Sequence, residues 1–305
     1  MVVITGATGN TGRRATEALL AKGEKVRVIG RDATKLESFV QKGAEPFVGN
    51  VQDSATMTQA FDGATAVYLV IPESHTAEDL RAYQESVTNS YAAAVANSKV
   101  PYAVTLSSLG AQHPEKTGPI VGQYSFEQKM NSLGWLNVLH LRPAQFMENL
   151  LLSIAPMRSM GMLPGGVNSD DPSPWIATKD VGAYAAGRLA ARDFSGSSTQ
   201  ELSGPSDASM REIASIIGKA IGKPGLSYMK VPFMMLEPAL VQIGMPKKTA
   251  ALVIEMWKAG NGGLLAPQEP RSAKNTTPTT IESFVADVFL PAYLLPSYQS
   301  KIAAT

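Results

Sequence analysis

Cysteine is absent from this chain of 305 residues, and histidine occurs only three times. Without cysteine the chain has no disulfide, no thiolate nucleophile and no cysteine ligand for a metal. His75, His113 and His140 lack close metal-ligand spacing, so no metal site is predicted. His140 alternates with Val138 and Arg142 in a predicted strand and is expected to be a satisfied core residue, whereas His75 is a candidate substrate contact.

Basic clusters and long hydrophobic runs are also missing. A net charge of +1 without a basic run does not favour a nucleic-acid surface, because such binding depends on clustered Lys and Arg. No uninterrupted apolar run reaches the ~18 residues of a membrane span, and the chain opens on a core strand where a signal peptide would stand. We therefore expect a cytoplasmic protein with no membrane or nucleic-acid partner. The absence of a G-x-S-x-G motif removes the simplest hydrolase alternative.

A glycine-rich turn is the clearest motif that is present. Residues 2–31 read VVITGATGNTGRRATEALLAKGEKVRVIGR, which predicts a strand, a turn through three glycines, a helix and a second strand. Gly6 allows a tight turn, Gly9 lets backbone amides approach a pyrophosphate, and Gly12 lets the helix pack on the strand. Arg13 and Arg14 stand in the first helical turn, where the helix dipole disfavours a cation unless an anion is bound nearby. The alternative is that both guanidiniums point into solvent.

The end of the second strand indicates which dinucleotide binds. Chains that select NAD usually place Asp or Glu there to hold the ribose 2′-hydroxyl. Here the position is Gly30, followed by Arg31. A missing carboxylate and a following guanidinium suit a 2′-phosphate, so NADPH or NADP is predicted and NAD is disfavoured. Lys35 is a candidate second phosphate contact, or else a solvated loop lysine.

Strand and helix patterns alternate through the first half of the chain. Such alternation predicts an α/β fold of Rossmann type, a doubly wound parallel sheet with helices on both faces. QELSG at 200–204 is expected to extend the sheet, and Asp180 to cap a helix through VGAYAAGRLAA. The predicted division is an NADP-binding domain and a smaller, mostly helical substrate-side portion, at 1–149 plus about 174–205 and at about 150–173 plus 206–305.

Further motifs are spread over nearly the whole chain: TGATGNTG, VRVIGRD, GNVQD, LSSLGA, LRPAQFMENL, PWIATKDVGAYAA, ELSGPSDASMREIASIIGKAIGKP and TPTTIESFVAD. Together they resemble the NmrA-like branch of the atypical short-chain dehydrogenases/reductases. The resemblance implies a Rossmann fold and an NADP-class cofactor. That branch includes NADPH-dependent reductases of quinones, dyes and other unsaturated small molecules. It also includes redox-sensing transcriptional regulators that bind dinucleotide without turnover.

The helix predicted at SFEQKMNSLG and the residues just before it carry the candidate catalytic groups. Short-chain dehydrogenases commonly use a Tyr with a Lys four residues later, so that the ammonium lowers the pKa of the phenol. Tyr124 is followed at that spacing by Gln128. Lys129 comes one residue later, so its side chain is rotated by roughly 100° around the helix from the position that the pair requires. The resembled branch often has Lys or His four residues before a Glu. Counting back from Glu127 gives Gln123, which has no ionisable proton.

Hydrogen-bonding roles remain open for this region. Gln123 could bond to the nicotinamide, the ribose or a substrate oxygen, while Tyr124, Ser107 and Ser108 are candidate proton donors beside water. Glu127 is expected to form a salt bridge within its helix or between domains and not to act in catalysis. The candidate catalytic residues are therefore Tyr124, Gln123 and Ser107.

Ligands of such sheets bind beyond the carboxyl ends of the strands, so the residues that leave the strands are the candidate cofactor contacts. They are Gly6, Thr8, Gly9, Asn10, Thr11, Gly12, Arg31, Lys35, Asn50, Val51, Ile71, Pro72, Ser107, Ser108, Gln123, Pro143, Ala144 and Phe146. Gln145 and Asn149 lie in the same region, although each could instead cap the next helix.

Methionine is frequent after Leu150, and its flexible thioether suits a pocket for flat or varied apolar molecules. Ordinary helix packing or a subunit interface is the alternative. The candidate substrate contacts are His75, Phe146, Met147, Asn149, Met160, Met162 and Trp257, with Met234 and Met235 as further apolar candidates.

The sequence therefore predicts an NADPH-dependent reductase, a monomer or homodimer, that transfers hydride to a small apolar acceptor such as a quinone, enone, imine or dye. A non-catalytic NADP(H)-binding sensor is the main alternative, because the tyrosine–lysine pair is out of register. An isomerase or epimerase that keeps its dinucleotide bound is the third possibility.

Overall fold

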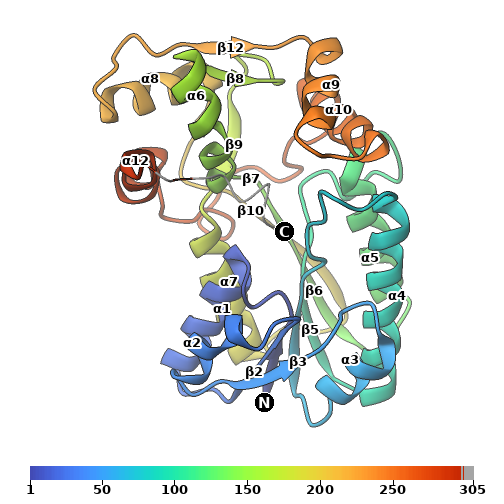
Figure 1. Ribbon diagram of the computed structural model, residues 1–305. Coiled ribbons are helices and arrows are strands. Elements are labelled where there is room, and N and C mark those ends of the chain that lie inside the picture. Colours follow the sequence, from blue (N-terminus) through green and yellow to red (C-terminus); the bar gives the residue numbers. More distant parts are fainter. Residues whose placement is uncertain (297, 299–305) are drawn as a thin grey trace.

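The structure, a computed structural model, describes residues 1–296 and 298. Seven parallel strands form its central sheet in the order β10-β6-β5-β4-β1-β2-β3 (Figure 1). Their bounds are β1 Val2–Ile4, β2 Val26–Gly30, β3 Glu45–Val48, β4 Ala66–Leu69, β5 Tyr102–Leu106, β6 Asn137–Pro143 and β10 Ser197–Leu202. This confirms the Rossmann-type sheet, including its extension by the strand that contains the start of QELSG.

Helices cover both faces of the sheet. One face carries α1 (Asn10–Ala21), α2 (Glu37–Val40) and α7 (Thr178–Ala191), and the other carries α3 (Ser54–Ala60), α4 (Leu80–Ser98) and α5 (Val121–Asn131) (Figure 1). Successive residues of a strand point to opposite faces. In β1, Val2 and Ile4 accordingly enter the first core and Val3 enters the second, all fully buried.

The sheet changes direction of winding at β1. Val2 pairs with Val26 of β2 on one side and with Ala66 of β4 on the other. In open α/β sheets, ligands bind beyond the carboxyl ends of the strands at such a switch point. The glycine turn that follows β1 therefore stands where the fold places a ligand.

A third apolar core lies beyond this edge, in the upper part of the molecule in Figure 1. Trp175, only 1% exposed, lies within it, and its indole Nε1 donates to the backbone oxygen of Ala208 at 3.2 Å. The surrounding elements are β7 Gln145–Phe146, η3 Met147–Ser153, α6 Ile154–Met160, β8 Leu163–Gly165, β9 Ser173–Ile176, β11 Asp207–Ala208, α8 Met210–Ala220, β12 Tyr228–Lys230, α11 Ile281–Phe284, η4 Val285–Phe289 and α12 Leu290–Leu294. Helices α9 (Phe233–Gln242) and α10 (Lys247–Asn261) stand apart from it in the same view, with α10 packed on the short helix η2 (Gly118–Ile120).

The cap predicted for α7 is wrong. The helix begins at Thr178, with Ala177 in the capping position, so Asp180 lies in its first turn. The amide of Thr178 is instead satisfied by the carboxylate of Glu148, at 3.1 and 3.0 Å. Asp180 accepts hydrogen bonds from the amide and hydroxyl of Thr279 at 3.0 and 2.9 Å, which ties α7 to the C-terminal segment.

His140 is a core residue, as the strand pattern predicts. Its side chain lies between Thr105 and Asn131, with Nδ1 2.7 Å from the threonine hydroxyl and Nε2 2.9 Å from the asparagine Oδ1. A neutral ring that carries its proton on Nε2 satisfies both contacts, since it accepts from the hydroxyl and donates to the amide oxygen. Burial lowers the pKa of His140 to about 4.

We expect His140 to make the protein less stable in mild acid. An unfolded histidine titrates near 6.5, so below that pH the unfolded state binds a proton that the folded state does not bind until about pH 4. Stability is therefore complete above about pH 6.5 and falls as the pH drops toward 4, by at most about 3 kcal/mol. Urea unfolding at several pH values should show a smaller acid loss for His140→Gln. An equal loss in both proteins would contradict this assignment.

Candidate cofactor and substrate site

The glycine turn leaves the start of α1 open. Gly6 has φ of +61°, and its carbonyl accepts the amide of Gly9 at 2.9 Å. A Cβ at Gly12 would lie 2.2 Å from that same carbonyl oxygen, so only glycine fits. Gly9 occupies the N-cap without a side-chain hydrogen bond, and the first turn of α1 has no acidic residue. Free helical amides and the positive end of the helix dipole fit a pyrophosphate.

Cations surround the end of β2, while its nearest carboxylate is engaged elsewhere. Arg31 is exposed and forms no ion pair with the described residues. Asp32 accepts the amide of Thr34 at 2.9 Å and its hydroxyl at 2.7 Å, and these bonds hold the pKa of Asp32 below its ordinary value. Arg13 lies over the ring of Phe39 at 5.4 Å, on the side of α1 that faces this segment.

The two remaining cations near the turn differ in their surroundings. Lys35 is exposed in the short helix η1 (Thr34–Leu36), close to the end of β2. Arg14 forms an ion pair with Glu17 at 3.2 Å, and its side chain is 54% exposed. The solvated alternative thus fits Arg14, whereas Arg13, Arg31 and Lys35 are the group that could hold a 2′-phosphate.

A buried charge pair lies at the carboxyl ends of β5 and β6. Ser107 follows β5 and donates its hydroxyl proton to Oε1 of Glu127 at 2.5 Å. Arg142, near the end of β6, donates to both carboxylate oxygens of Glu127, from Nε at 2.9 Å and from Nη2 at 2.6 Å. Ser107, Glu127 and Arg142 are 5%, 1% and 8% exposed. Glu127 forms a salt bridge, as the sequence predicts, but its partner Arg142 lies on β6 of the same predicted domain and not in its own helix or in the other domain.

This network fixes where the N-terminal turn of α5 lies. Glu127 is level with the last residues of β5 and β6, and Gln123 precedes it by one helical turn on the same face. Gln123, with Tyr124 beside it, therefore lies past the carboxyl ends of the strands, where open α/β sheets bind ligands. The amide oxygen of Gln123 is buried and has no hydrogen-bond partner among the described residues. An unsatisfied buried acceptor in this place fits a ligand that supplies a donor.

The other candidate cofactor contacts lie at the ends of the remaining strands. Asn50 is exposed and accepts the amide of Gln52 at 3.1 Å. The hydroxyl of Ser108 donates to the backbone oxygen of Leu109 at 2.9 Å. Several of the remaining side chains are buried or half-buried, so they would offer backbone atoms or small contact surfaces: Thr8, Thr11, Val51, Ile71, Pro72, Pro143, Ala144 and Phe146.

His75 follows the loop after β4 and contacts Glu73, with Nε2 3.4 Å from Oε2. This hydrogen bond raises the pKa of the His75 imidazole and lowers that of the Glu73 carboxyl. The Glu73 side chain is 80% exposed, so solvent screens the pair and it adds little to stability. The contact favours a protonated, hydrogen-bond-donating His75.

The candidate apolar substrate contacts do not share one environment. Met147 is 1% exposed and packs in the third core, so in this structure it is a packing residue and not a pocket wall. Met160 is 48% exposed, and Met162 is half-buried. Trp257 of α10 is half-buried and lies beside Gly166, where an added Cβ would be 2.7 Å from the indole ring.

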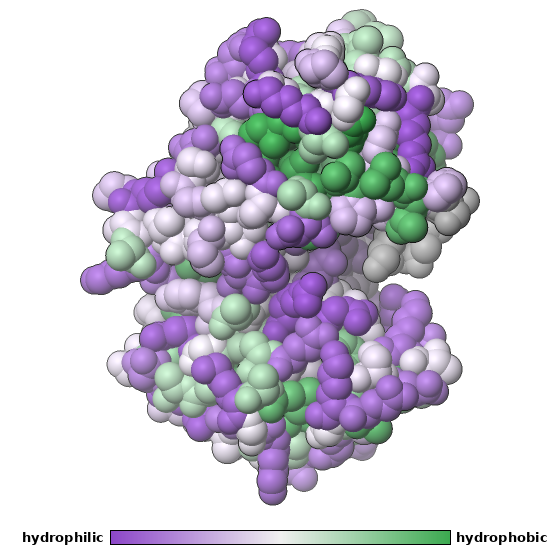
Figure 2. All heavy atoms as spheres, turned by 90° about the vertical axis from the view of Figure 1, so that its left-hand side faces the viewer, coloured by the Kyte–Doolittle hydropathy of each residue, from purple (hydrophilic) through white to green (hydrophobic). Residues whose placement is uncertain are grey.

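Helix α9 presents an unusually apolar surface. Met234 and Met235 are 82% and 62% exposed, and no residue of this helix is buried. Figure 2 faces the side of the molecule that carries α8 and α12, away from α9, and shows further apolar side chains gathered on the upper half there. Gln145 and Asn149, which follow β6, are exposed and cap no helix, so the capping alternative is wrong for both.

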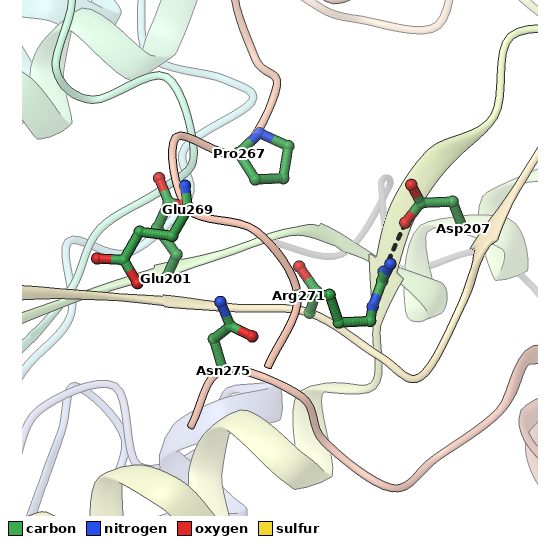
Figure 3. Close-up of a pocket in the computed structure, with 7 residues that line it drawn as sticks. Glu201, Asp207, Pro267, Glu269, Arg271 and Asn275 are labelled. Carbon is green, nitrogen blue, oxygen red and sulfur yellow. Dashed lines mark hydrogen bonds and ion pairs between the residues drawn. The ribbon is translucent and has the colours of Figure 1, made fainter. Parts of the chain in front are cut away.

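Sequence patterns gave little indication of Arg142, Glu148 and Glu201 as structural partners. Glu201 of β10 is 5% exposed, and its carboxylate accepts the amides of Gln268 and Glu269 at 3.0 to 3.1 Å. Figure 3 shows Glu201 and Glu269 on one side of a cavity of about 210 Å³, with Arg271 directed at Asp207 on the other. The sequence signal for Arg142 is the alternation of His140 and Arg142 with Leu139 and Leu141 in β6, whereas β10, SSTQEL, has no such alternation.

The described residues contain neither a membrane-spanning helix nor a cluster of metal ligands. None of the helices in residues 1–296 combines the length and apolarity needed to cross a membrane. Within the same part of the chain, no three His, Asp or Glu side chains are grouped so that they could hold a metal ion.

Comparisons with known proteins identify relatives of this chain and proteins of the same fold. The chain is similar to a (4-alkanoyl-5-oxo-2,5-dihydrofuran-3-yl)methyl phosphate reductase of Streptomyces griseus. The two are 30% identical over 227 residues, and this match covers 73% of this chain and 75% of the relative. The chain is 23% identical to an NAD(P)H azoreductase of Xenophilus azovorans, over 84% of this chain and 86% of that protein. An NADPH-dependent quinone oxidoreductase of Escherichia coli, solved with NADPH, superposes with a TM-score of 0.79 at 22% identity, over 95% of this chain and all of that one. The NmrA-like family model matches residues 1–285, and the chain therefore belongs to the NmrA-like family.

Proposed function

We propose that this protein is an NADPH-dependent reductase that transfers hydride to a small apolar acceptor with a conjugated double bond, such as a quinone, enone, imine or azo dye. The uncapped glycine turn carries this proposal, because Gly12 leaves no room for a side chain and the helical amides beyond it have no partner in their own cap. The relatives named as reductases of azo compounds, quinones and a dihydrofuranone support the reaction class.

Backbone amides and cationic side chains are the groups proposed to hold the dinucleotide. When bound, NADPH supplies the hydride. The amides of α1 hold the pyrophosphate, and Arg31, Lys35 and Arg13 neutralise the 2′-phosphate. The position at the end of β2 where a carboxylate would favour NAD is Gly30, which has no side chain to bind the ribose 2′-hydroxyl. The residues after β5 and the first turn of α5 approach the nicotinamide.

The acceptor is held between the sheet edge and the upper part of the molecule. Half-buried Phe146, Met162 and Trp257 are the proposed apolar contacts. Tyr124 is the proposed proton donor beside water, and a strongly electrophilic acceptor such as a quinone needs no stronger acid after it takes hydride. The main contribution of the protein is then orientation and exclusion of water.

Oxidation of NADPH in the presence of a panel of quinones, enones, imines and azo dyes tests this function. Turnover with at least one class, faster with NADPH than with NADH, is expected. Tight NADPH binding without turnover would support the sensor alternative instead. Interconversion of an added substrate without net loss of NADPH would support the isomerase alternative.

Arg31→Ala is expected to raise the KM for NADPH by about 10-fold or more, because a hydrogen bond to a charged group contributes roughly 1.5–3 kcal/mol. The KM for NADH should change by less than about 3-fold, since NADH lacks the 2′-phosphate. Arg14→Ala is the matched control, because Arg14 pairs with Glu17 in solvent. Equal effects of the two substitutions on NADPH would contradict the role of Arg31.

A further inference from the structure

The hydroxyl of Ser107 already donates its one proton to a partner inside the protein. Ser107 donates to Glu127 at 2.5 Å, and its backbone amide donates to the oxygen of Leu141 at 2.7 Å. A serine hydroxyl carries one donor and two acceptor lone pairs. The donor faces the carboxylate of Glu127 inside the protein, so only acceptor capacity remains for a ligand.

Arg142 keeps this arrangement in place. It donates two hydrogen bonds to Glu127, which is 1% exposed, and these bonds raise the pKa of Arg142. An ionised carboxylate accepts hydrogen bonds and donates none, so Glu127 cannot return a proton to Ser107 while Arg142 is beside it. Arg142 also donates from Nη1 to Oε1 of Gln268 at 3.5 Å, and Gln268 lies in the segment whose amides bind Glu201.

We propose that Glu127, paired with Arg142, is a positioning residue that makes Ser107 an obligate hydrogen-bond acceptor, and that Ser107 accepts from the carboxamide amino group of the nicotinamide. This inference rests on the proposed NADPH-dependent function. The unpartnered amide oxygen of Gln123, from the first turn of α5, is a second acceptor in the same region. A carboxamide amino group has two N–H donors and suits two acceptors.

The same arrangement bears on the proton that accompanies hydride. Ser107 could donate to a reduced acceptor only by abandoning Glu127, which would leave a buried carboxylate with one hydrogen bond fewer. Ser107 is thus removed from the candidate proton donors, and Tyr124 and water remain.

Calorimetric titration of NADP⁺ and of its 3-acetylpyridine analogue tests the inference without turnover. In the analogue a methyl group replaces the carboxamide amino group, so the two N–H donors are lost. The wild-type protein should bind NADP⁺ about 10-fold more tightly than the analogue. Ser107→Ala should reduce this preference to about 2-fold, because the alanine accepts from neither ligand.

Two further variants separate positioning from structure. Glu127→Met with Arg142→Met removes the pair and frees the Ser107 proton, so the preference should fall to about 3-fold although Ser107 is present. Ser132→Ala, at the other end of α5, is the control and should keep the wild-type preference.

The possible failures can be told apart. A 10-fold preference retained in Ser107→Ala, or no preference in the wild-type protein, would overturn this inference and leave NADPH binding intact. Failure of the wild-type protein to bind either nucleotide would overturn the proposed function as well.

Discussion

Gly12→Ala is expected to weaken NADPH binding by at least about 100-fold. The new methyl carbon would lie 2.2 Å from the carbonyl oxygen of Gly6, 2.7 Å from its carbonyl carbon and 3.1 Å from the Cα of Ala7. All three are backbone atoms, so α1 must move away from the turn. Such movement misaligns the helical amides proposed to hold the pyrophosphate, and overpacking of this kind costs about 1–3 kcal/mol or more of stability.

Gly187→Ala is the matched control for this change. It makes the same substitution in helix α7, where the new methyl carbon meets nothing within 4 Å. Because alanine favours helix over glycine, a gain of about 0.5–1 kcal/mol in the free energy of unfolding is expected, with unchanged NADPH affinity. Fluorescence titration with NADPH and urea unfolding of both variants measure the contrast. Wild-type NADPH affinity in Gly12→Ala would show that the turn does not hold the cofactor.

The Rossmann half of the fold could be predicted because its signals are local. The β-branched run Val2 to Ile4, the spacing of Gly6, Gly9 and Gly12 and the alternation of strands and helices are all read within short windows. The sheet order then follows from the winding of such folds. A strand at QELSG was expected to extend the sheet, and β10, which begins at Ser197 and contains the start of that segment, pairs in parallel with β6.

The polar contacts between distant segments could not be predicted in this way. Glu127 and Arg142 are 15 residues apart, and Glu148 and Thr178 are 30 apart. The incorrect cap at Asp180 has this cause, because a carboxylate from another segment satisfies the start of α7. Met147 shows a related limit, since methionine is equally suited to a pocket and to a core.

Arg142→Ala is expected to lower the free energy of unfolding by about 3–5 kcal/mol. The main cause is the buried charge that the substitution leaves unpaired. The carboxylate of Glu127 is 1% exposed, and the hydroxyl of Ser107 would be its remaining side-chain partner. Urea unfolding near neutral pH measures it. Glu127→Met alone should also be destabilising, because it strands the guanidinium of Arg142.

Combining Glu127→Met with Arg142→Met should recover most of this stability, to within about 1 kcal/mol of the wild-type protein, since no buried charge is then left unpaired. That recovery would show that the pair contributes little net stability. Glu127 and Arg142 would then be explained by their effect on Ser107, because they fix the direction in which its hydroxyl proton points. Additive losses in the combined variant would instead assign the pair a structural role, and the nucleotide preference would have to be explained without it.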